Sequence, residues 1–200
     1  MCAKPDYSTN WGRRFRRFGR RQQMIDKTGK LSRLAVLLAL ATAIHSLESL
    51  IPVTVGWFRF GFANIIGLTT LYMFGFKDAA LLTMGRILLG SLISGQFGSP
   101  GFLLAIAGGL SSIFVMGGAY WLAGRLLSEI GISVLGAVTH NMVQLWVAYA
   151  IFVKTQSILL LMPVMILAAI GTGVINGLAT KFLIKRIESL DARNLTNTDS

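Results

Sequence analysis

Charge and cysteine are both scarce in this sequence. Charged residues make up 14% of the 200 residues, against about 25% in an average soluble protein. Cys2 is the only cysteine, which excludes a disulfide within the chain and a metal site built on cysteine ligands. Hydrophobic residues reach 54% and the mean hydropathy is +0.64, more than a water-soluble surface permits.

The familiar catalytic patterns are missing as well. The sequence contains no phosphate-binding loop, no nucleophile elbow and no aspartate-rich pair for diphosphate chemistry. The net charge of +11 could indicate nucleic acid, yet no helix-turn-helix pattern or aromatic-basic RNA motif accompanies it. We therefore expect no nucleic-acid partner.

What the sequence does contain is one long apolar zone between residues 31 and 186. A helix needs about 20 apolar residues to cross a bilayer, so this zone has room for six. Short breaks of glycine, proline or charge predict helices over 31–51, 61–76, 79–94, 102–122, 132–152 and 158–184. We expect an all-α, polytopic membrane protein: a six-transmembrane-helix bundle over 31–186, a basic cytoplasmic segment over 1–30 and a polar cytoplasmic tail over 187–200.

The distribution of lysine and arginine predicts the orientation. Ten of the nineteen lie in the first 33 residues, beside the first apolar run. With both termini in the cytoplasm, sixteen fall on the cytoplasmic side and only Arg59 and Lys154 outside, with Arg86 within a span. Positive charge is concentrated on the cytoplasmic side of membrane proteins. The basic N-terminal segment is also suited to anionic lipid headgroups.

Polar residues inside the apolar zone are the candidate site, because charge is costly there and usually faces a cavity. His45 and Glu48 share a face of the first helix; Glu48 either pairs with His45 or Arg59 or belongs to a binding site. Their spacing also suits a metal, but His140 is the only other histidine, so we expect no metal and no cofactor.

Arg86 lies near the middle of the third predicted helix. Its planar fork is suited to carboxylate or phosphate, although a structural pair with Glu48, or bonds to the carbonyls of a broken helix, would also explain it. The aromatic loop 52–61 is either a lid over a ligand or a segment on the bilayer interface. The ligand-binding residues we predict are His45, Glu48, Arg59, Asn64, Arg86, His140, Asn141 and Gln144.

Small residues indicate where helices approach closely. Ala35 and Ala39 are four residues apart on the first helix, on a different side from His45 and Glu48. Pairs of glycines on the fourth helix, and the small residues 169, 173 and 177 on the sixth, also allow close packing. Packing within the bundle is the simpler explanation for the sixth helix.

Three segments carry a resemblance to a known family: 59–64, 85–90 with the turn 95–101, and 136–144. Residues 31–186 resemble the bacterial Gx transporter family, also labelled heptaprenyl diphosphate synthase component I. The six-helix plan is similar to the substrate-binding S components of energy-coupling factor transporters. In those, small residues of helix 1 dock a transmembrane coupling subunit, which implies this role for Ala35 and Ala39.

The resemblance implies a membrane subunit in the inner membrane of a bacterium. We expect it to capture a small metabolite, with an anionic one among the options, related to a vitamin, a quinone or an isoprenoid. An energy-coupling module with ATPase subunits would be its partner. The alternatives are a non-catalytic accessory subunit of prenyl-diphosphate or quinone synthesis, and an autonomous small secondary transporter. Prenyl elongation uses clustered aspartates, and the predicted helices contain none, so we do not expect an enzyme.

Overall fold

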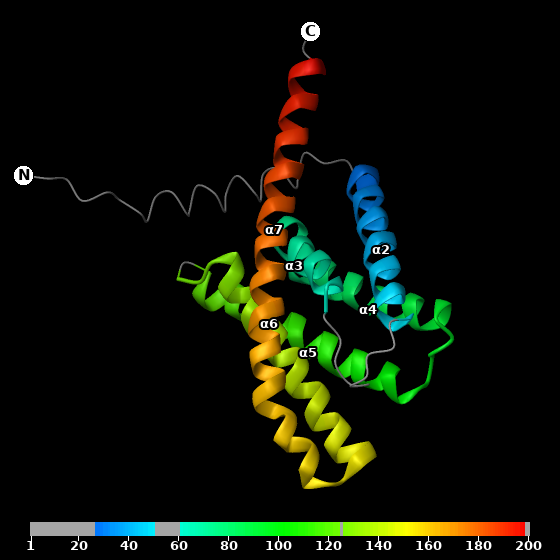
Figure 1. Ribbon diagram of the computed structural model, residues 1–200. Coiled ribbons are helices and arrows are strands. Elements are labelled where there is room, and N and C mark those ends of the chain that lie inside the picture. Colours follow the sequence, from blue (N-terminus) through cyan, green and yellow to red (C-terminus); the bar gives the residue numbers. More distant parts are fainter. Residues whose placement is uncertain (1–26, 51–60, 125, 199–200) are drawn as a thin grey trace, which may run out of the picture.

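The computed structural model describes residues 27–50, 61–124 and 126–198, and these form helices joined by short turns, without a strand among them (Figure 1). The predicted all-α class is confirmed. Arg59 and most of the aromatic loop lie outside the described residues.

Four helices are long and apolar enough to cross a membrane. The candidate spans fall on α2 (Lys27–Leu50), α5 (Pro100–Ala123), α6 (Glu129–Val147) and α7 (Met162–Thr198). The third of these crossings continues α6 into a π-helix, η1 (Ala148–Val153), and the fourth begins in a 3-10 helix, η2 (Gln156–Leu161). A multi-pass membrane protein follows from these four.

The other two helices are shorter or more charged. The 12 residues of α3 (Ala63–Phe74) are fewer than a bilayer crossing needs. The 18 residues of α4 (Phe76–Ile93) include the charged Lys77, Asp78 and Arg86. The six predicted helices therefore all exist, but six crossings are not implied by length and composition alone.

The predicted helices 61–76 and 79–94 leave the charged pair Lys77 and Asp78 as the break between them, and this prediction is wrong: the break between α3 and α4 is at Gly75. Gly75 has φ +94°, a conformation that residues with a Cβ rarely adopt. Asp78 instead lies in the first turn of α4, where a negative charge complements the helix dipole. Its carboxylate is 2.6 Å from the Lys30 ammonium, so an ion pair joins the start of α4 to α2.

The last helix is longer than predicted. It begins at Met162 after the 3-10 turn, with Pro163 in its first turn, and continues to Thr198 rather than ending at Ile184. Pro163 is compatible with this start because the first helical N–H groups have no partner within the helix. The segment predicted as a polar tail is therefore largely helical.

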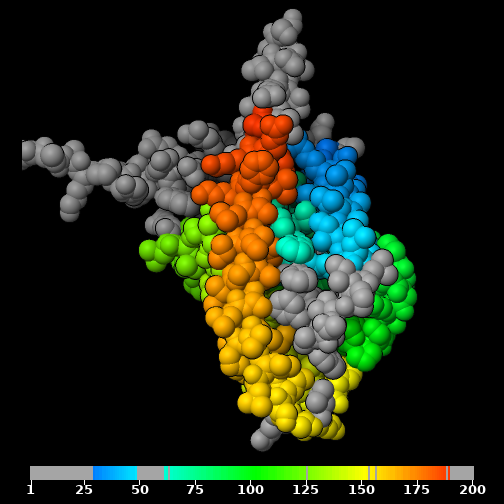
Figure 2. Space-filling view, viewed as in Figure 1, coloured from blue at the N-terminus to red at the C-terminus, as the bar shows by residue number. Residues whose placement is uncertain are grey.

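The two helices nearest the ends of the described chain run in opposite directions and flank α3. In Figure 1, the start of α2 and the end of α7 lie at the same end of the molecule. In Figure 2, α3 is visible in the gap between α7 and α2. A buried apolar cluster from α2, α3 and α4 fixes this corner of the bundle: Leu37, Ala41, Ile66, Phe74 and Leu82.

The small residues of α7 pack inside the bundle, as the simpler explanation required. Ala169 is fully buried. A Cβ on Gly173 would lie 2.7 Å from the Cα of Val134, and one on Gly177 would lie 2.6 Å from the Cα of Ile130. The backbones of α6 and α7 therefore approach closely, which glycine allows.

We expect Gly177→Ala to lower the midpoint of thermal unfolding of the purified protein. Alanine gains about 1 kcal/mol of helix propensity over glycine, but here its methyl group would meet the backbone of α6. Gly171→Ala is the matched control, because a Cβ at Gly171 meets nothing within 4 Å. Equal stability of the two variants would contradict this account of α6–α7 packing.

Candidate functional site

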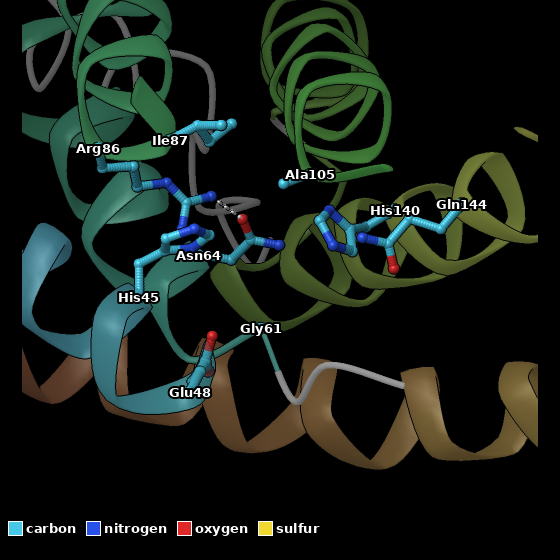
Figure 3. Close-up of a pocket in the computed structure, with 9 residues that line it drawn as sticks. All are labelled: His45, Glu48, Gly61, Asn64, Arg86, Ile87, Ala105, His140 and Gln144. Atoms are coloured by element: carbon cyan, nitrogen blue, oxygen red, sulfur yellow. Dashed lines mark hydrogen bonds between the residues drawn. The ribbon is translucent and has the colours of Figure 1, made fainter. Parts of the chain in front are cut away.

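A polar pocket opens where five of the helices meet. Its empty volume is about 300 Å³, which includes the open space at its mouth. In Figure 3, Arg86, Asn64 and His45 lie on one side and His140 and Gln144 on the other. The lining residues are His45, Glu48, Gly61, Asn64, Arg86, Ile87, Ala105, His140 and Gln144.

Arg86 is the permanent positive charge of this pocket. Its side chain is 4% exposed. One terminal nitrogen, Nη2, donates a hydrogen bond to the Asn64 side-chain oxygen at 2.9 Å (Figure 3). Asn64 belongs to the first turn of α3, so α3 sets the position of the guanidinium. Arg86 Nε is buried and has no hydrogen-bond partner among the described residues.

Glu48 and Asn176 hold the same peptide group from opposite sides. The Phe62 N–H donates to Glu48 Oε1 at 2.6 Å, and Asn176 Nδ2 donates to the Gly61 carbonyl at 3.1 Å. The N–H and C=O of a trans peptide point in opposite directions, so the Gly61–Phe62 peptide is hydrogen-bonded to α2 on one side and to α7 on the other. The Gly61 carbonyl also accepts the Asn64 N–H at 2.8 Å. The start of α3, and with it Asn64, is thereby fixed.

Glycines bring the pocket side chains close to neighbouring helices. A Cβ on Gly90 would overlap the His45 ring, and one on Gly108 would lie 2.8 Å from Gln144 Cγ and 3.1 Å from the His140 ring. His45 therefore packs directly on α4, while His140 and Gln144 pack directly on α5. Gly108 belongs to one of the glycine pairs noted on the fourth predicted helix, and it makes room for two side chains that line the pocket.

The Gln144 side chain is 3% exposed and its amide has a defined orientation. Its amide nitrogen, Nε2, donates a hydrogen bond to the Leu104 carbonyl at 3.4 Å. Exchanging the amide nitrogen and oxygen would place two acceptors against each other. Gln144 Oε1 is buried and has no hydrogen-bond partner within the described part of the chain.

The structure brings together six of the eight residues predicted to bind a ligand: His45, Glu48, Asn64, Arg86, His140 and Gln144. Asn141 is the exception among the described residues. It is one position, about 100°, around the helix from His140, and its Nδ2 donates to the Met165 carbonyl of α7 at 3.3 Å. Arg59 lies outside the described residues. Ligand binding by this set stays a prediction.

Asn176 and Thr180 are supporting residues that the sequence prediction missed. Thr180 Oγ1 donates to the Ile65 carbonyl at 3.3 Å, one turn along α7 from Asn176. Both side chains are at most 1% exposed. Their signal was present in the sequence: an asparagine and a threonine four apart in an otherwise apolar helix share a face and need buried partners.

Ala35 and Ala39 lie away from the pocket. Both are exposed on the surface of α2. Thr42 follows Ala39 on the same side of the helix and is 6% exposed. This side of α2 is therefore open at Ala35 and Ala39 and packed inside the bundle at Thr42.

The comparison with known families identifies the chain. Residues 37–183 match heptaprenyl diphosphate synthase component I. The chain belongs to this family. The match includes every described pocket residue and the supporting positions of α7. No curated protein and no solved structure matches the chain significantly.

We expect Asn176→Leu to speed hydrogen exchange at the first turn of α3 about fivefold, the equivalent of about 1 kcal/mol for one lost hydrogen bond. The substitution keeps the size of the side chain but removes the donor to Gly61. Exchange would be followed by mass spectrometry in detergent. Thr172→Val is the control, because the Thr172 hydroxyl bonds only within α7. Unchanged exchange in Asn176→Leu would contradict the role given to Asn176.

Proposed function

We propose that this family member is a membrane subunit that binds a small anionic metabolite in the pocket around Arg86. The observation that carries the proposal is the buried guanidinium, which lines a polar pocket together with Glu48 and, among the described side chains, donates a hydrogen bond to the neutral Asn64. A charge in the membrane interior costs at least about 2.5 kcal/mol. A carboxylate or phosphate group would offset that cost and would accept hydrogen bonds from the planar guanidinium.

The proposal extends to a substrate-capture subunit of the S-component kind, energised by a partner ATPase module. The bundle would have six crossings and cytoplasmic termini in a bacterial inner membrane, with the pocket in its outer half. The support is the sixteen-to-two distribution of basic residues and the open face of α2 at Ala35 and Ala39. That face would dock the coupling subunit, because small residues let helices approach. The metabolite would be related to a vitamin, a quinone or an isoprenoid.

The family description favours a second candidate, a non-catalytic accessory subunit of prenyl-diphosphate synthesis. In that role the pocket would hold the diphosphate end of an isoprenoid. Asp78, the aspartate that the structure adds to α4, pairs with Lys30 and does not line the pocket.

The anion site can be tested with acetate, inorganic phosphate and pyrophosphate as probes. We expect at least one of them to raise the thermal midpoint of the wild-type protein in detergent. In Arg86→Met the dissociation constant should increase more than tenfold, about 1.4 kcal/mol. Arg186→Met is the matched control, since Arg186 is exposed on α7 and should not affect the probes. A preference for pyrophosphate would favour the accessory role. Equal probe binding by Arg86→Met and wild type would overturn the proposal.

The docking face can be tested separately by co-purification from the native host. We expect Ala35→Leu and Ala39→Leu to lose ATPase subunits that accompany the wild-type protein, because a bulky side chain keeps the partner helix away. The thermal midpoint should stay unchanged, since both positions are exposed. Ala150→Leu, at an exposed position in η1, is the control. Recovery of the same partners by all three variants would exclude this face as the docking surface.

A further inference from the structure

Two buried polar atoms of opposite character belong to side chains that line the pocket. Arg86 Nε, a donor, and Gln144 Oε1, an acceptor, are both buried without a hydrogen-bond partner among the described residues. They belong to α4 and α6, and Figure 3 shows their side chains on opposite sides of the pocket. A buried polar atom without a partner costs about 1–3 kcal/mol. A ligand would offset this cost by supplying an acceptor to Arg86 Nε and a donor to Gln144 Oε1.

The chemical demand at Gln144 is specific. Because Nε2 already donates to the Leu104 carbonyl, Oε1 is the atom left to interact, and an amide oxygen only accepts. An anionic oxygen of a ligand cannot satisfy it, because two acceptors repel each other. The group that fits Gln144 Oε1 is an N–H or an O–H.

We propose that the ligand is a small anion that also carries a hydrogen-bond donor, with its anionic group at Arg86 and its N–H or O–H at Gln144. Hydroxy acids and carboxylates with a neighbouring N–H belong to this class. Simple alkyl carboxylates do not. The inference rests on the proposed function and narrows it, since it selects among anions.

The close packing of this wall supports discrimination between such anions. Gly108 lets Gln144 and His140 lie directly on α5, and both side chains are at most 8% exposed. A rigid buried acceptor rejects ligands that lack the matching donor, because the acceptor is then left unpaired. Recognition of the donor is therefore expected to affect selectivity more than total affinity.

The test compares two carboxylates of the same shape. Pyrrole-2-carboxylate presents a ring N–H, whereas 2-furoate presents a ring oxygen that only accepts; glycolate and propionate form a second, smaller pair. Binding of millimolar probes to purified wild-type protein would be measured by ligand-observed NMR. We expect the donor-bearing member of at least one pair to bind about tenfold more tightly, and Gln144→Met to reduce that ratio to near one.

Arg86→Met separates the two levels of the account. Suppose that Arg86→Met abolishes binding of both probes of a pair, while the wild type binds the donor-bearing probe no more tightly than the other. The donor inference is then wrong and the anion site stands. If binding is the same in Arg86→Met and wild type, or no probe of either pair binds the wild type, the anion site is wrong and the inference falls with it. The ratio of the two probe affinities is measured on the wild-type protein, so it remains decisive even if Gln144→Met fails to fold.

Discussion

The buried hydrogen bond between Arg86 and Asn64 is the contact on which the rest of the site depends. It joins a guanidinium that is 4% exposed to a neutral amide in the interior of an apolar bundle. The Asn64 amide orients the guanidinium, while the carboxylate of Glu48 lines the same pocket and attracts the guanidinium electrostatically. In the proposed function an anionic ligand would bind Arg86 beside Glu48.

The position of Asn64 depends in turn on helices that are distant in sequence. The Gly61–Phe62 peptide is held by Glu48 from α2 and Asn176 from α7, so both outer helices control the first turn of α3. A coupling subunit that docks on α2 would act on the helix that carries Glu48.

The sequence predicted the helices and most of the pocket because the bilayer simplifies both problems. Apolar runs need little tertiary information to be recognised as helices, and Glu48 or Arg86 in such a run must face the interior.

Prediction failed where a local geometry decided the outcome. Gly75, rather than the charged Lys77 and Asp78, ends α3 because only its backbone adopts φ +94°. Asn141 follows His140 by one position, about 100° around α6, so its side chain contacts α7 rather than the pocket. The partner of Asn176 could not be predicted without the three-dimensional fold, since Gly61 is 115 residues away.

The central claim is that the pocket binds a small anion through Arg86. The most direct measurement is native mass spectrometry of the protein purified from its native membrane, with chemical identification of any small molecule released from it. The account predicts an acidic metabolite bound to the wild type in a one-to-one ratio and missing from Arg86→Met. A wild-type protein that carries only membrane phospholipid, or an Arg86→Met variant that retains the same metabolite at the same occupancy, would contradict it.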